Sequence, residues 1–166
     1  MADHRGFDDV LESNADYAAG FRLAGLEPIA AKGLAIVTCM DSRIEPLTML
    51  GLVPGDAKIL RNAGARVTDD VLRTLVLARY LLGVERVMVV AHTQCRMAGG
   101  TEQDIHVAIE AAGGPDIRDM SFLVATDQEA AVRADVQRAR SSAYLSGTEI
   151  GGFLYDVETG SVTRVC

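Results

Sequence analysis

Short apolar runs that alternate with amphipathic segments are the feature that most constrains the fold of this chain. The run at residues 34–38 is continuous, which is typical of a strand covered on both faces of a parallel sheet. The runs at 57–60, which contains Lys58, and at 86–91, which begins with Arg86, are two further predicted strands. Between the second and third runs, residues 68–82 carry apolar side chains at helical spacing, and Thr68 is the predicted N-cap. This order predicts an α/β fold with a largely parallel central β-sheet flanked by helices.

The other predicted elements extend this pattern over the 166 residues. We expect helices over residues 7–23, 101–112 and about 126–143, a further strand over 121–125, and a C-terminal hairpin or antiparallel edge strand formed by 153–157 and 162–165. A chain of this length can bury a core of its own. We therefore expect a single domain over residues 1–166, with residues 1–32 as an N-terminal helical arm that packs on its own domain or on a partner subunit.

Charge and composition exclude several classes of protein. The formal net charge of −7 disfavours binding to nucleic acid or to an anionic membrane surface, because both attract basic proteins. No apolar stretch reaches the roughly 20 residues that span a bilayer, and the polar start of the chain lacks the apolar region of a signal peptide. We therefore expect a cytoplasmic protein, whose three cysteines are reduced thiols or metal ligands rather than disulfides.

Cysteine and histidine side chains follow two of the predicted strands. Cys39 comes directly after the first run, and His92 and Cys95 follow the run at 86–91. Ligands gather beyond the carboxyl ends of parallel strands, so we expect these side chains to converge. Zinc prefers sulfur and imidazole ligands in tetrahedral sets, and catalytic sites keep a fourth position open. The pattern predicts a Zn²⁺ site with three protein ligands; buried packing cysteines and an ordinary hydrogen-bonded histidine are the alternative.

Asp41 and Arg43 lie close to the first predicted ligand. Side chains two residues apart on an extended segment point the same way, so the carboxylate and the guanidinium can form charge-assisted hydrogen bonds. On an ordinary surface such a pair would contribute little to stability. Beside a metal, Asp41 could bind the ion as a fourth ligand in a closed state. Alternatively, held by Arg43, it could accept a hydrogen bond from the metal-bound water, and the sequence leaves both arrangements open.

Three short motifs occur in a specific order along the chain. They read Cys39-Met40-Asp41-Ser42-Arg43, Arg61-Asn62-Ala63-Gly64 and His92-Thr93-Gln94-Cys95. Together they resemble the motifs of the β-class carbonic anhydrases, and the short chain is similar to the compact bacterial and archaeal members. Family members often have Gly directly after the second cysteine, whereas this chain has Arg96.

The resemblance implies a specific activity and assembly. It implies that Cys39, His92 and Cys95 are zinc ligands, that Asp41 and Arg43 form the catalytic dyad, and that the protein is a homodimer or higher homo-oligomer. The implied reaction is the reversible hydration of carbon dioxide to bicarbonate and a proton by zinc-bound hydroxide. Two thiolates donate more charge to zinc than imidazoles do, so we expect the activity to rise with pH.

Asn62 and Gly64 are further candidates, because they lie in a predicted loop after the strand at 57–60. Gly64 would allow the backbone to approach a substrate pocket closely, and a simple turn is the alternative.

Other functions remain open from the sequence. The same zinc site could hydrolyse carbonyl sulfide or carbon disulfide, which are linear, carbon-centred electrophiles like carbon dioxide. A non-catalytic zinc-binding regulatory protein would keep the three ligands without an exchangeable fourth position, although the presence of Asp41 and Arg43 speaks against it. A redox role would instead join Cys39 and Cys95 in a reversible disulfide.

Overall fold

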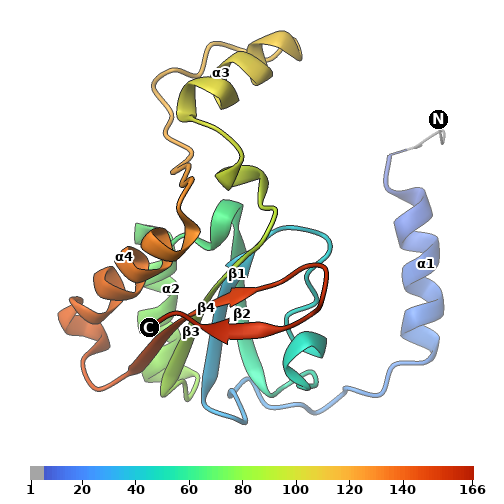
Figure 1. The fold of residues 1–166 in the computed structure, drawn as a ribbon. Coiled ribbons are helices and arrows are strands. Elements are labelled where there is room, and N and C mark those ends of the chain that lie inside the picture. Colours follow the sequence, from blue (N-terminus) through green and yellow to red (C-terminus); the bar gives the residue numbers. More distant parts are fainter. Residues whose placement is uncertain (1–5) are drawn as a thin grey trace.

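The computed structural model describes residues 6–166, and residues 1–5 of the predicted arm lie outside the described part. Figure 1 shows a central sheet with helices packed against it and other helices that project from the rest of the chain. The strands are β1 (Leu34–Cys39), β2 (Ala57–Asn62), β3 (Arg86–His92), β4 (Glu149–Tyr155) and β5 (Val162–Arg164). The helices are α1 (Asp8–Ala19), α2 (Asp69–Leu81), α3 (Glu102–Ala111) and α4 (Gln128–Arg140).

The five strands form one sheet in the order β2-β1-β3-β4-β5. The pairs β1–β2, β1–β3 and β3–β4 are parallel, and only β5 runs antiparallel, along β4. The predicted α/β fold with a largely parallel sheet and an antiparallel edge strand is therefore confirmed. Because β1 and β3 are neighbours and run the same way, the residues that end them lie at one edge of the sheet.

Alternate residues of the strands face different environments. One face of the sheet carries Ala35, Val37, Val87 and Val89, which pack with the buried side of α2 and α4. The opposite face carries Leu34, Ile36 and Val90, which pack with a loop that contains Met49 and Leu50. Both faces of β1 are thus buried, which explains why its sequence is apolar without alternation.

The strand predicted over residues 121–125 is wrong. This segment is irregular, and Leu123 has a left-handed backbone (φ 57°) that an extended strand does not allow. The carboxylate of Glu102 accepts hydrogen bonds from the backbone N–H groups of Phe122 (2.9 Å) and Val124 (2.8 Å). A side chain of α3 therefore supplies the partners that a neighbouring strand would otherwise provide.

The strand that completes the sheet begins earlier than predicted. The predicted hairpin is present, but β4 starts at Glu149 and pairs with β3 along its whole length. Gly151 and Gly152 hide this strand in the sequence, since glycine is rare in strand interiors. Both are buried, and a Cβ on Gly152 would collide with the Val132 side chain of α4. The glycines are thus required by close helix–sheet packing.

Two helix ends also differ from the predictions. Asp127 caps α4 by accepting a hydrogen bond from the Ala130 N–H, and the helix ends at Arg140, before the predicted end at about 143. Helix α1 is shorter than the predicted 7–23 and has no buried residue. It stands apart from the sheet, joined to β1 by an irregular segment (Figure 1). Among residues 6–166, no helix combines the length and the apolar character needed to cross a membrane.

Candidate metal centre

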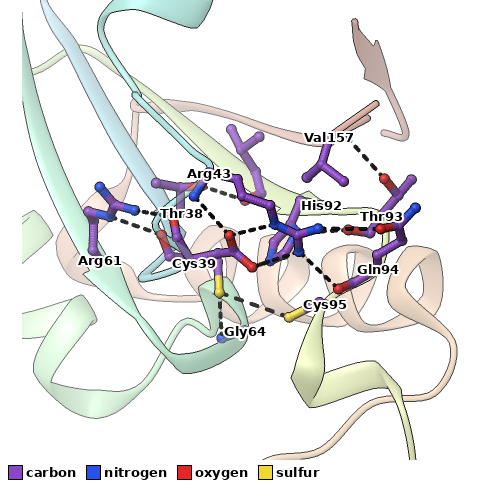
Figure 2. A network of polar contacts seen from close by, with 12 residues as sticks. Thr38, Cys39, Arg43, Arg61, Gly64, His92, Thr93, Gln94, Cys95 and Val157 are labelled. Atoms are coloured by element: carbon purple, nitrogen blue, oxygen red, sulfur yellow. Dashed lines mark hydrogen bonds and ion pairs between the residues drawn. The ribbon is translucent and has the colours of Figure 1, made fainter. Parts of the chain in front are cut away.

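Three potential ligand atoms converge at the carboxyl edge of the sheet. Cys39 is the last residue of β1, His92 is the last residue of β3, and Cys95 lies in the loop that follows β3. The sulfur atoms of Cys39 and Cys95 are 3.9 Å apart, and a ring nitrogen of His92 lies within 4.8 Å of both. All three residues are buried, and the close view in Figure 2 shows them around one point. The predicted convergence is therefore observed, and the group could hold a metal ion.

The distances and the hydrogen bonds fit a tetrahedral ion. Two sulfurs bound to one zinc at about 2.3 Å would lie about 3.8 Å apart at a tetrahedral angle, close to the observed separation. The Nδ1 atom of His92 lies 2.8 Å from the Thr93 carbonyl oxygen, so Nδ1 carries the proton and donates it there. Within residues 6–166, His92 Nε2 is buried and has no hydrogen-bond partner, so it is left as an unsatisfied acceptor beside the two sulfurs. An orphaned buried nitrogen of this kind is what a metal ligand requires.

The two thiols have opposite proton affinities. A hydrogen bond from Cys95 is the main cause that lowers the pKa of Cys39 to about 3, against the opposing effect of burial; His92 and the Gly64 N–H add to the lowering. The pKa of Cys95 is raised, because its proton is held by the Cys39 sulfur and because burial disfavours a second charge. A cation bound to both sulfurs would displace the proton that they share, because thiols bind metals as anions.

Asp41 is held tightly by Arg43. Arg43 Nε donates to Asp41 Oδ1 (2.9 Å), Nη2 donates to Oδ2 (2.8 Å), and the Arg43 backbone N–H also reaches Oδ1 (3.0 Å). These hydrogen bonds hold the pKa of Asp41 well below its usual value, so the carboxylate is ionised. Asp41 Oδ2 lies 3.8 Å from His92 Nε2, which places the ionised group beside the three convergent ligands.

Residues that the sequence did not single out also contact the centre. Arg61 donates to the carbonyl oxygens of Cys39 (3.0 Å) and Asp41 (2.6 Å), and so fixes the backbone that follows β1. Arg43 also contacts Gln94, which in turn contacts Glu158 in the turn between β4 and β5. Arg61 and Gln94 belong to two of the three motifs, although the sequence assigned them no role, whereas no sequence pattern connects Glu158 to the site.

The candidate pocket residues have different surroundings. The amide of Asn62 exchanges hydrogen bonds with the backbone of Arg66 (2.7 and 2.9 Å) and so braces the turn after β2. Gly64 has a left-handed backbone (φ 80°), and its N–H lies 3.4 Å from the Cys39 sulfur. Arg96, where the family often has Gly, is exposed at the start of a short 3-10 helix, Arg96–Ala98.

A Cys₂His centre at the carboxyl edge of a parallel sheet, flanked by an aspartate–arginine pair, defines a class of metal-binding α/β proteins. Comparison with known proteins identifies the family within this class. A family model described as Carbonic anhydrase matches residues 34–112. Beta-carbonic anhydrase 1 of Mycobacterium tuberculosis is 37% identical over 161 residues, which cover 95% of this chain and 96% of that protein. The chain belongs to the β-carbonic anhydrase family, as its motifs predicted, and the prediction of an enzyme of the lyase class is confirmed at this level.

Two further relatives define the range of the similarity. The crystal structure of a carbonic anhydrase from Streptococcus mutans matches with a TM-score of 0.90 and 39% identity, covering 96% of this chain and 97% of that chain. A carbon disulfide hydrolase of an Acidianus species is 38% identical over 98 residues, which are 59% of this chain and 47% of that protein.

Proposed function

We propose that this protein binds Zn²⁺ through Cys39, His92 and Cys95 and catalyses the reversible hydration of carbon dioxide to bicarbonate and a proton. The observation that carries the proposal is the ionised Asp41 carboxylate, fixed by Arg43, beside three buried ligand atoms that fit one tetrahedral ion. Zinc is favoured because thiolate and imidazole are its usual ligands in proteins.

The bound ion would supply a nucleophile at neutral pH, because zinc lowers the pKa of a coordinated water from about 15.7 towards about 7. The protein side chains orient the attack. Asp41 can act only as a hydrogen-bond acceptor, since Arg43 keeps it ionised. It therefore accepts a hydrogen bond from the attacking oxygen and directs the free lone pair of that oxygen towards the carbon of carbon dioxide.

Arg43 has the complementary role of positioning Asp41. Arg43 leaves a lone pair free on Asp41 Oδ2, so this oxygen could either accept a hydrogen bond from the attacking oxygen or bind the ion. We assign Asp41 the role of acceptor, because a catalytic ion needs a fourth position that stays open for exchange.

Carbon disulfide and carbonyl sulfide are the competing substrates. Several relatives are named carbon disulfide hydrolase, and two of them match 59% of this chain at 37–38% identity. Carbon dioxide is favoured because a carbonic anhydrase is 37% identical over 95% of the chain, whereas a carbon disulfide hydrolase structure that covers the same share is 26% identical. A non-catalytic zinc protein is disfavoured because it would have no use for an ionised carboxylate fixed beside the ligands.

The proposal is tested by metal analysis of the purified protein together with stopped-flow assays of the three substrates. We expect stoichiometric zinc and a hydration rate for carbon dioxide that rises between pH 7 and pH 9. Protein that is loaded with zinc but inactive on carbon dioxide, and active on carbon disulfide, would transfer the proposal to the second substrate. Loaded protein inactive on all three substrates would support the regulatory alternative.

We also propose a homodimer or higher homo-oligomer in the cytoplasm. Helix α1 and the Phe7 residue that precedes it expose large apolar side chains that a stable free surface rarely carries, including Phe7 (77% exposed) and Leu11 (64%). A relative from Sordaria macrospora is described as tetrameric. The free thiols of Cys39, Cys95 and Cys166 are compatible with a reducing compartment.

A further inference from the structure

The hydrogen bonds around Arg43 extend beyond Asp41. We propose that Gln94 and Glu158 form a positioning pair that holds the outer edge of the Arg43 guanidinium and thereby keeps Asp41 turned towards Arg43. This inference rests on the proposed active site, and it assigns a role to two residues that do not contact the three ligand atoms.

A second aspartate–arginine pair shows that the local contact is not special by itself. Asp116 and Arg118 have the same two-residue spacing and the same bidentate geometry, with distances of 2.9 and 2.7 Å. Their side chains are 63% and 74% exposed, and such surface pairs contribute little to stability. Asp41 is 19% exposed and Arg43 is 44% exposed, so the pair at the site lies in more enclosed surroundings. The two pairs also differ in what the second edge of the arginine guanidinium contacts.

The second edge of Arg43 is occupied by Gln94. Arg43 Nη2 donates to the Gln94 backbone carbonyl (3.1 Å), and Nη1 donates to the side-chain Oε1 of Gln94 (3.3 Å). Figure 2 shows Arg43 lying between the segment after β1 and the loop after β3. The guanidinium therefore ties together the two segments that carry the ligands, and its planar shape lets it contact both at once.

Glu158 orients the Gln94 amide. Gln94 Nε2 donates to Glu158 Oε1 over 2.6 Å, so the amide presents its oxygen to the guanidinium and its nitrogen to the carboxylate. The reverse orientation of the amide would set donor against donor and acceptor against acceptor. Donation therefore runs outward from Arg43, to Asp41 on one side and through Gln94 to Glu158 on the other.

The turn that carries Glu158 is itself fixed to the ligand loop. The Thr93 N–H donates to the Tyr155 carbonyl (2.9 Å), and the Val157 N–H donates to the Thr93 hydroxyl (3.1 Å). Gln94 also has a left-handed backbone (φ 54°), which is uncommon for a residue other than glycine and which the surrounding contacts must maintain. The pair is therefore held on both sides by defined backbone, as a positioning role requires.

The test compares Gln94→Ala, Glu158→Ala, the double variant and Glu158→Gln. Gln94→Ala keeps the Cβ and hence the same backbone restriction, so it isolates the amide. Glu158→Gln keeps an oxygen that can accept from Gln94 Nε2. Ser161→Ala is the control, because it changes the same turn and the Ser161 hydroxyl contacts only Thr159 in the described hydrogen bonds.

Two measurements are made on each zinc-loaded variant. The first is kcat/KM for carbon dioxide hydration, and the second is the hydrogen-exchange rate of the Arg43 Nε–H by ¹⁵N NMR, which does not depend on turnover. We expect both Ala variants to lose about three- to tenfold in kcat/KM, mainly in kcat, and to exchange the Arg43 proton several times faster. The double variant should be no more impaired than the more impaired of the two single Ala variants. Glu158→Gln should keep both kcat/KM and the Arg43 exchange rate close to their wild-type values.

The outcomes separate this inference from the proposed function. Glu158→Ala with the wild-type rate and the wild-type exchange would overturn the inference, as would Glu158→Gln being as impaired as Glu158→Ala. If the wild type does not hydrate carbon dioxide, the proposed function fails, and the Arg43 exchange rates still decide whether the pair holds the guanidinium.

Discussion

At the scale of single residues, small local contacts decide which atoms are available for chemistry. The Thr93 carbonyl accepts a hydrogen bond from His92 Nδ1–H, which leaves the lone pair of Nε2 available beside the sulfurs. Arg43 donates hydrogen bonds to both oxygens of Asp41 and keeps that carboxylate ionised. A substitution at Asp41 tests the role of its ionised carboxylate. A substitution at Gly64 tests a third local contact, that of the Gly64 N–H with the Cys39 sulfur.

Asp41→Asn should retain zinc and lose turnover. The amide keeps the size of the side chain but lacks the charge that accepts a hydrogen bond from the attacking oxygen, so we expect a loss of at least about 100-fold in kcat. Metal analysis and stopped-flow assays measure the two quantities. Asp116→Asn is the matched control, because it disrupts an aspartate–arginine pair of the same local geometry. Unchanged turnover in Asp41→Asn would refute the role of Asp41.

Gly64→Ala should destabilise the protein and weaken metal binding. The left-handed backbone disfavours alanine, and the new Cβ would lie 3.3 Å from Met97 Cβ, which disturbs the N–H contact with the Cys39 sulfur. We expect the free energy of unfolding to fall by about 1–2 kcal/mol in denaturant titrations. Gly51→Ala has a similar backbone (φ 65°) with nothing near the new Cβ and serves as the control. Equal zinc affinities of the two variants, in competition with a chelator, would contradict this account.

At the scale of elements, the sequence predicts a helix or strand best when the signals that define it lie within its own residues. Strands β1 and β3 and the Thr68 cap of α2 follow from apolar runs and a local capping signal, and all three are observed. The errors occur where a distant residue decides the structure. Glu102 stabilises the irregular segment at 121–125, and α4 requires the glycines of β4, so neither feature can be recognised from the local pattern.

The candidate site also has features that the local sequence predicts and features that distant residues decide. Cys39, His92 and Cys95 were predicted to converge because strand ends carry them, and parallel pairing brings those ends together. The contacts of Gln94 with Glu158 could not be predicted, since they depend on where the turn after β4 lies relative to the ligand loop.

The contact between Glu102 and residues 121–125 should depend on pH. Hydrogen bonds from Phe122, then Val124, lower the pKa of Glu102 in the folded protein. Its stabilising effect is therefore complete above the ordinary glutamate pKa of about 4.3 and is lost as the pH falls through the lower folded value. Hydrogen-exchange NMR of the two amides, corrected for intrinsic rates, should show protection that declines below about pH 4.

A variant provides the same test at neutral pH. Glu102→Ala should remove protection of the Phe122 and Val124 amides, whereas Glu110→Ala, on the exposed part of the same helix, should not. Equal protection in both variants would show that another contact holds the segment.

At the scale of the whole molecule, α1 is the element that the rest of the chain does not explain. Its apolar side chains are exposed, and it stands away from the sheet (Figure 1). Val10→Ser with Leu11→Ser should therefore weaken the predicted oligomer, because these side chains would lose the apolar area that drives association. Light scattering coupled to size exclusion measures the mass, and Glu12→Ser with Asn14→Ser is the control. A wild type that is monomeric at micromolar concentration would contradict the oligomer.

The location of the two cysteines has a consequence for how the protein matures. Cys39 and Cys95 are 56 residues apart in sequence, and only the pairing of β1 with β3 in the middle of the sheet brings them together. An unfolded chain cannot offer all three ligands at once, so the binding energy of the cation adds to the stability of the native state. If the centre holds zinc as proposed, the resistance of the protein to heat and to proteolysis should rise with the concentration of free zinc.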